Sequence, residues 1–102
     1  MRVILSLAML LAGAVCASAQ TVCTEPAPPP LIDGAQANAD QLRAAMAQAH
    51  EFMAQSEMYQ ACLTQAGDPD AKTRIVASRR VEEAVGRANS AALDVYKRAH
   101  AN

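Results

Sequence analysis

Residues 62–70 read CLTQAGDPD and join two long helical patterns. Gly67 is placed to end the first helix, because glycine readily adopts the left-handed conformation found at C′. Asp68 is expected to be the N-cap of the second helix and Pro69 its first residue, where a missing N–H costs nothing. A connection this short requires antiparallel neighbours. The stretch therefore predicts an all-α helical hairpin over residues 38–102, with helices at about 39–66 and 69–100.

The first helix carries a regular apolar seam. Asn38 is expected as its N-cap, and Gln41 stands at the N3 position of a capping box. Apolar or small residues then recur in steps of three and four at Leu42, Ala45, Ala49, Phe52, Ser56, Tyr59, Leu63 and Ala66. This is the a/d pattern of a coiled coil. The seam predicts the face on which the second helix packs.

The second helix has a less regular apolar side, made mostly of small residues. Its members are Ala71, Ile75, Ser78, Val81, Val85, Ala88, Ala92, Tyr96 and Ala99. Small side chains at such a seam predict a close approach of the two helices. Three large apolar side chains fall off both seams and are expected to be exposed, namely Met58, Val76 and Leu93.

Residues 1–19 have the features of a cleaved export signal. A positively charged start precedes an almost unbroken apolar run over residues 3–15, and the small residues 17–19 form a signal-peptidase site. The apolar run is shorter than the roughly 20 residues that span a membrane. Cleavage predicts a periplasmic or secreted bacterial protein that begins at Gln20 and has no integral membrane span. An uncleaved anchor and a lipidated Cys16 remain as alternatives.

Cleavage would leave Cys23 and Cys62 as the two cysteines of the mature chain. In an oxidising compartment such a pair most often forms a disulfide. Cys62 lies about 36 Å along the first helix from Asn38 at 1.5 Å per residue. The segment from Cys23 to Asn38 reaches about 46 Å if it is extended at 3.1 Å per residue. An intramolecular bridge is therefore expected, with a bridge between two chains and two free thiols as the alternatives.

Residues 20–37 are predicted to form an extended arm. Pro26, Pro28, Pro29 and Pro30 favour polyproline II conformation, because proline fixes φ and lacks a backbone donor. Pinned by the disulfide, the arm would lie back along the first helix. Leu31 and Ile32 are its expected packing residues.

Length and net charge limit the number of domains and the class of partner that the protein can bind. Removal of residues 1–19 leaves 83 of the 102 residues, enough for one small domain. Loss of Arg2 leaves eight basic against ten acidic side chains, a formal charge of −2. This balance gives no overall attraction to nucleic acid, so none is expected as a partner. A protein partner or self-association is expected instead.

Met46, His50, Met53 and Glu57 fall on one strip of the first helix at helical spacing. Thioether and imidazole groups are ligands that copper accepts, so the strip is a candidate metal site. The simpler interpretation is a pair of seam-flanking methionines beside a surface histidine, and no cofactor is expected. Five basic residues form a second candidate site, a basic patch on the second helix: Lys72, Arg74, Arg79, Arg80 and Arg87. This patch could bind an anionic surface, or it could be a solvated face beside an acidic helix.

The sequence contains no motif typical of a catalytic site. The histidines are His50 and His100, and neither lies in a motif with a serine or cysteine nucleophile. Glycine-rich phosphate loops are absent as well. The protein is therefore not expected to be an enzyme.

Several short motifs together resemble those of a known group. They are Cys23-x-x-Pro26, Pro30-x-x-Asp33-Gly34, Gln41, Tyr59-x-x-Cys62-Leu63, Asn89 and Tyr96-Lys97. The chain resembles uncharacterised small exported helical-hairpin proteins of alphaproteobacteria, which share a signal peptide and a Cys-x-x-Pro…Pro-Asp-Gly arm. The resemblance implies a source and a compartment and carries no activity with it. Leu31-Ile32, between the proline and Asp-Gly, is where this chain departs from the group.

The sequence thus predicts an antiparallel two-helix hairpin with an extended Pro-rich N-terminal arm pinned by one disulfide. The expected function is that of a non-catalytic exported protein acting through a helical interaction surface, with a chaperone-like or stress-related role as one version. The alternative is a periplasmic copper-binding module that uses the Met/His strip.

Overall fold

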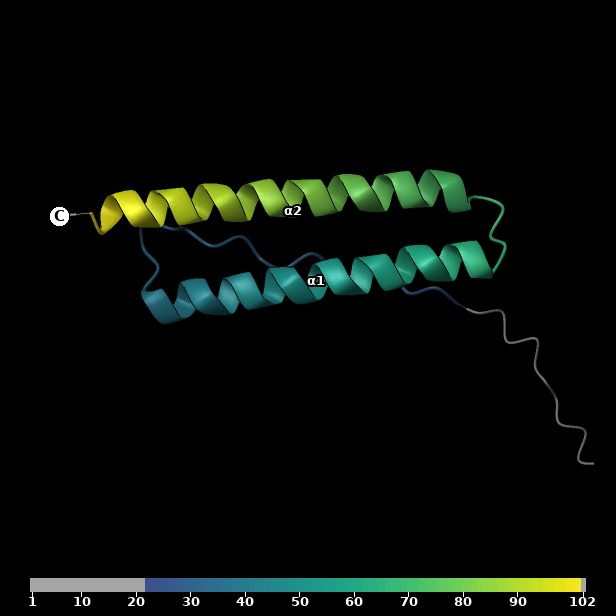
Figure 1. Ribbon diagram of the computed structural model, residues 1–102, viewed down its shortest axis with the longest axis horizontal. Coiled ribbons are helices and arrows are strands. Elements are labelled where there is room, and N and C mark those ends of the chain that lie inside the picture. The colour runs from purple at the N-terminus through teal and green to yellow at the C-terminus, as the bar shows by residue number, and fades with distance from the viewer. Residues whose placement is uncertain (1–21, 102) are drawn as a thin grey trace, which may run out of the picture.

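The computed structural model describes residues 22–101, which form two antiparallel helices side by side and an extended arm (Figure 1). Helix α1 spans Ala39–Gln65 and helix α2 spans Ala71–Ala99. Cys23 and Cys62 form a disulfide within the chain. The expected all-α hairpin with a disulfide-pinned arm is confirmed. The predicted signal over residues 1–19 lies outside the described residues.

The start of α1 has the predicted capping box. The Gln41 N–H donates to Asn38 Oδ1 over 2.8 Å, and the Asn38 N–H donates to Gln41 Oε1 over 2.9 Å. Two of the N–H groups that a helix start leaves free are thereby satisfied. Gly67 has a φ of 63°, the left-handed conformation expected after the end of α1.

The start of α2 differs from the prediction. Pro69 was expected to be its first residue, but the helix begins at Ala71. Its N-cap is Asp70, whose side chain makes no capping bond, so the prediction of Asp68 as the N-cap is wrong. Asp68 Oδ1 instead accepts the Asp70 N–H over 2.7 Å, within the turn that precedes the helix. The Asp68 carbonyl also accepts the Ala71 N–H over 3.0 Å, a bond three residues along the chain. Residues 69–70 therefore form a tight turn that leads into the helix.

The helices meet along the predicted seam. In α1 the buried residues all belong to that seam: Leu42, Ala49, Phe52, Ser56, Tyr59 and Leu63. Ala66, its predicted last member, is exposed beyond the helix end. In α2 the buried residues are Ser78, Val85 and Ala92. The centre of the core is formed by Ala49, Phe52 and Val85.

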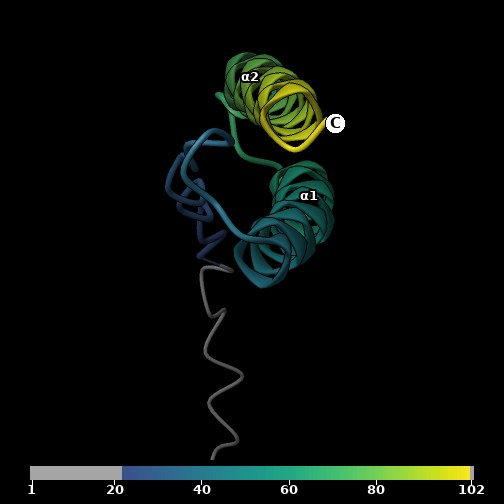
Figure 2. The same cartoon turned by 90° about the vertical axis from the view of Figure 1, so that its left-hand side faces the viewer.

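The arm lies beside both helices, behind them in Figure 1 and to their left in Figure 2. Between residues 23 and 32, every third side chain is half-buried and the others are exposed: Cys23, Pro26, Pro29 and Ile32 are the half-buried ones. A polyproline II helix has three residues per turn, so this period places one edge of the arm on the helices. Ile32 packs as expected. Leu31 lies between the half-buried residues Pro29 and Ile32 and is 81% exposed. The prediction that Leu31 packs is wrong.

A turn connects the arm to α1. Asp33 Oδ1 accepts the Ala35 N–H over 2.9 Å, and the Asp33 carbonyl accepts the N–H groups of Gln36 and Ala37. Gly34 is buried in this turn against α2, where a Cβ atom would collide with the Ala92 carbonyl. The arm is thus held at the disulfide on α1 and at Gly34 on α2. Within residues 22–101, neither helix is long and apolar enough to cross a membrane.

Candidate functional site

The structure divides the predicted basic patch into paired and unpaired cations. Arg74 donates to Asp68 over 2.8 Å, and this hydrogen bond raises the pKa of the guanidinium above its ordinary value. Arg87 lies 4.0 Å from Glu83. The other three residues of the patch, at 72, 79 and 80, have no ion pair with any residue that the structure describes. Within the basic patch, these three are the cations that remain available to a partner.

Two of the unpaired cations share one strip of α2. Residues four apart are neighbours on the surface of a helix, and a row of such neighbours runs through Lys72, Val76, Arg80, Ala84 and Ala88, winding gradually around α2. Its side chains are exposed except for Ala88, which is half-buried. We call these five residues the α2 strip. Arg79 lies about two turns beyond Lys72, next to this row, and lines neither of the two hollows that follow it.

Two hollows follow the α2 strip and meet at Arg80. The first has a volume of about 340 Å³ and is lined by Lys72, Thr73, Val76, Ala77 and Arg80. The second has a volume of about 480 Å³ and lies between the arm and α2; it is lined by Pro28, Pro29, Leu31, Arg80, Val81, Ala84, Val85 and Ala88. We call the second hollow the arm–helix groove. Apart from Arg80 its lining side chains are apolar, so it can accept apolar groups beside a positive charge.

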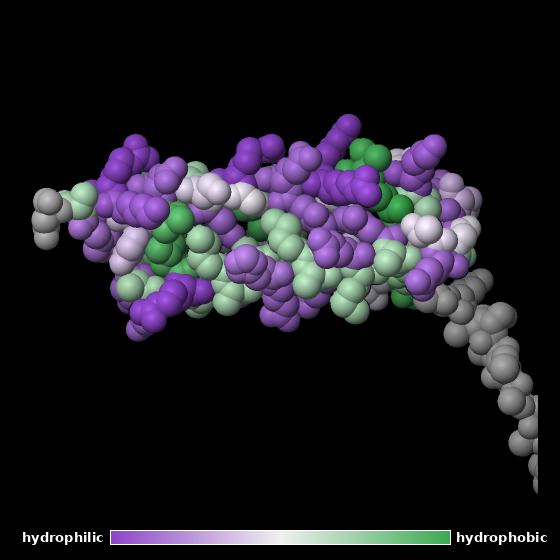
Figure 3. Space-filling model, viewed as in Figure 1, coloured by the Kyte–Doolittle hydropathy of each residue, from purple (hydrophilic) through white to green (hydrophobic). Residues whose placement is uncertain are grey.

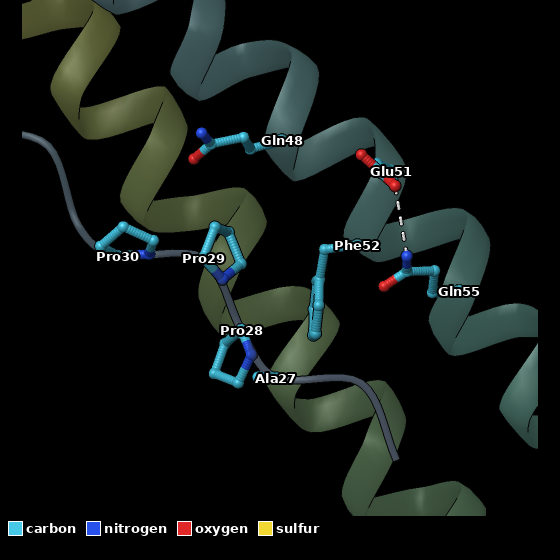
Figure 4. Close-up of a pocket in the computed structure, with 8 residues that line it drawn as sticks. All are labelled: Ala27, Pro28, Pro29, Pro30, Gln48, Glu51, Phe52 and Gln55. Atoms are coloured by element: carbon cyan, nitrogen blue, oxygen red, sulfur yellow. Dashed lines mark hydrogen bonds between the residues drawn. The ribbon is translucent and has the colours of Figure 1, made fainter. Parts of the chain in front are cut away.

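The opposite side of the arm has a different character. A hollow of about 430 Å³ lies between the arm and α1, with Gln48, Glu51, Phe52 and Gln55 facing residues 27–30 (Figure 4). Gln55 donates to the Glu51 carboxylate over 3.3 Å in this hollow. The arm therefore separates this hollow, with its glutamate and two glutamines on α1, from the apolar groove with Arg80 on α2.

The Met/His strip is only partly brought together. Met46, His50 and Met53 line one hollow of about 180 Å³ between the helices, together with Ala49, Gly86 and Asn89. Glu57 does not line it. Met53 packs against the core, while His50 is exposed. Among residues 22–101, no group of three or more His, Cys, Asp or Glu side chains is placed to hold a metal ion.

The face seen in Figure 3 is largely hydrophilic, with pale apolar patches along α1 and a few stronger apolar spots. Of the side chains expected to be exposed off the seams, Met58 is 72% and Val76 is 43% exposed. Leu93 is half-buried, so the prediction that it is exposed is wrong. Val22 and Leu31, each 81% exposed, are the other large apolar side chains at the surface of the described chain.

A polar cluster across the helix interface is not predicted by the sequence. Gln60 Nε2 donates to Ser78 Oγ over 3.1 Å and to Glu82 Oε1 over 2.6 Å. Ser78 was expected only as a small seam residue, and Gln60 lies outside the predicted seam. The cluster fixes how the helices are aligned lengthwise, because sliding one along the other would break both bonds. No local sequence signal marks Gln60, since its partners lie on the other helix.

No protein-family model, curated protein or solved structure matches this chain. Its function has to be inferred from the chemistry of its surfaces. Among these, the α2 strip with the arm–helix groove combines exposed apolar side chains with unpaired charge.

Proposed function

We propose that this is a non-catalytic exported protein that binds other proteins through the α2 strip and the arm–helix groove. The observation that carries the proposal is the position of unpaired Lys72 and Arg80 beside exposed Val76 and Leu31. Exposed apolar side chains rimmed by polar groups are typical of protein interaction sites. Arginine is enriched at such sites because it combines an apolar stem with several donors.

The scaffold suits binding because the groove is already formed. One wall is a helix, and the other is a proline-rich arm held at Cys23 and at Gly34. A partner that binds two rigid walls pays little conformational entropy to order them. Among residues 22–101, the cysteines are Cys23 and Cys62, and neither is available as a nucleophile because both are in the disulfide. The imidazole of His100 is also engaged within the chain: it contacts the Tyr96 carbonyl and stacks on the Tyr96 ring, with ring centroids 4.1 Å apart.

Export is supported by the covalent structure. A structural disulfide forms and persists in oxidising compartments such as the periplasm. The signal pattern of residues 1–19 points to the same destination. The proposed place of action is therefore the periplasm or the medium outside a bacterial cell.

The proposal is tested by photo-crosslinking in the bacterial envelope. A photoreactive amino acid is placed at Val76, and in a matched control at Ala54, which is exposed on α1. Discrete protein adducts from position 76 and none from position 54 are expected. An absence of adducts at position 76, in a chain that is exported and disulfide-bonded, would contradict the proposed function.

One version of this function is chaperone-like. Leu31, Met58 and Val76 would then contact unfolded clients through their exposed side chains. The purified protein should suppress the light scattering of a heat-denatured client such as citrate synthase. No suppression at any ratio of protein to client would remove this version and leave binding of folded partners.

A copper-binding module is the second candidate function. The observation that favours it is the hollow shared by Met46, His50 and Met53. A copper titration of the disulfide-bonded protein should then raise the melting temperature, and Met46→Leu should abolish the rise while leaving the helices intact. A melting temperature unchanged by copper would exclude this function.

A further inference from the structure

We propose that the α2 strip and the arm–helix groove bind an acidic segment of a partner protein, with its carboxylates on Lys72 and Arg80 and its apolar side chains beside Leu31. This inference rests on the proposed function and names the chemistry of the partner. Val76 lies between the two cations on the strip, and Leu31 stands on the opposite wall of the groove.

The two ends of the site differ in chemistry, one being basic and the other apolar. Lys72 and Arg80 line the hollow near the start of α2, and the apolar lining of the groove continues from Arg80 to Ala88. From Lys72 to Ala88 the helix advances about 24 Å at 1.5 Å per residue. An extended segment of about seven residues covers this distance at 3.3 Å per residue. The partner segment would therefore carry acidic residues at one end and apolar residues at the other.

Charge complementarity favours an acidic segment. Arg43, Arg74 and Arg87 are each in an ion pair, whereas Lys72 and Arg80, like the three other cations of the described chain, are not. Of these unpaired cations, Lys72 and Arg80 are the ones that line the two hollows. A carboxylate that contacts Arg80 at the edge of an apolar hollow is partly shielded from water. An ion pair in such a place is stronger than one in full solvent.

A segment fits this surface better than an anionic bilayer does. The arm itself carries exposed Glu25, and Glu51 lines the hollow on the α1 side of the arm. A flat anionic surface laid across the arm would bring these carboxylates close to lipid phosphates. Like charges at close range oppose binding. A narrow segment that stays on the α2 side of the arm avoids both carboxylates.

The test measures binding of a defined peptide to the disulfide-bonded protein by fluorescence anisotropy. The probe is a fluorescein-labelled seven-residue peptide with two aspartates followed by alternating leucine and alanine. A second peptide replaces both aspartates with lysine. The acidic peptide should bind, the basic peptide should not, and binding should weaken as salt increases. Equal binding of the two peptides would overturn the proposal.

Matched variants locate the site. Arg80→Glu should weaken binding by about tenfold or more, whereas Arg79→Glu, with the same change in net charge, should change it by less than about threefold. Leu31→Ser should weaken binding similarly, and Met58→Ser, at another exposed apolar residue, should not. All four side chains are exposed, so the helical content measured by circular dichroism should stay unchanged. Equal effects at Arg80 and Arg79 would also overturn the proposal.

A second copy of the chain or a lipid surface bound at this site would give a different experimental result from an acidic segment. A dimer in sedimentation equilibrium that Arg80→Glu dissociates would show that a second copy covers the strip. Cosedimentation with phosphatidylglycerol vesicles that depends on Arg80 would show a lipid surface. Either result overturns the acidic-segment proposal. Protein adducts at position 76 without binding of the acidic peptide would leave the proposed function standing and remove only this inference.

Discussion

Gly34 lies directly against the backbone of Ala92, with no side chain between the turn and α2. At the other end of the arm, Cys23 is bonded to Cys62 on α1, with the two Cα atoms 5.6 Å apart. The arm is therefore attached to a different helix at each end. This arrangement makes an otherwise solvent-exposed proline segment one wall of a groove.

The first prediction concerns the fit at Gly34. Gly34→Ala should destabilise the fold by about 1–3 kcal/mol, because the added methyl group would collide with backbone atoms that cannot move away. The matched control is Gly86→Ala, where the new methyl group would lie 3.9 Å from Met53 Cε. That change should stabilise α2 by about 1 kcal/mol through helix propensity. Urea denaturation measures both, and stabilisation by Gly34→Ala would show that the contact is absent.

The disulfide should supply much of the stability. Cys23 and Cys62 are 39 residues apart, and closing a loop of this length contributes about 4 kcal/mol on the chain-entropy estimate. Reduction, or the double change Cys23→Ala with Cys62→Ala, should lower the free energy of unfolding by about this amount. Urea denaturation with and without reductant checks the prediction. Identical midpoints would mean that the arm does not constrain the hairpin.

Ser56 carries an unsatisfied buried hydroxyl. It is 1% exposed, and its Oγ has no hydrogen-bond partner among the described residues. A buried polar group without a partner costs about 1–3 kcal/mol, so Ser56→Ala should stabilise the protein. A gain of 1 kcal/mol would raise the melting temperature by about 4–8 °C in a domain of this size.

Exposed Ser90 on α2 provides the control for Ser56. Ser90→Ala reports only the better helix propensity of alanine, which is worth a few tenths of a kcal/mol. Thermal melts followed by circular dichroism compare the two variants. If Ser56→Ala gains no more than Ser90→Ala, the Ser56 hydroxyl has a partner in solution.

Gln60 should matter more than its half-exposed position suggests. Gln60→Ala removes the donor to Ser78 and leaves that buried hydroxyl without its partner, which should cost about 1–2 kcal/mol. Gln55→Ala is the control, because Gln55 is exposed and, within the part of the chain that the structure describes, its side chain bonds Glu51 on the same helix and nothing on α2. Chemical denaturation of both variants gives the comparison. Equal losses would argue that the interhelical cluster does not fix the alignment of the helices.

Much of this fold could be predicted because its signals are local or one-dimensional. The seam from Leu42 to Leu63 follows from helical periodicity, and the Asn38–Gln41 capping box involves residues three apart. The Cys23–Cys62 bridge was expected from the pair of cysteines left after signal cleavage, and a count of residues along the extended arm showed that the arm can reach Cys62. The export signal, the copper strip and the absence of enzymatic activity stay predictions.

The sequence by itself therefore determined the two helices and their antiparallel connection, because helical period and capping depend on residues a few positions apart. It also determined the reach of the arm, because that reach follows from the number of residues in it. Only the tertiary structure decided which edge of the arm faces the helices, because that edge depends on contacts with residues far away in the sequence. That edge includes half-buried Ile32 and leaves Leu31 exposed. The pairing of Arg74 with Asp68, and the unpaired state of Arg80 beside the groove, depend likewise on where separate segments meet in space.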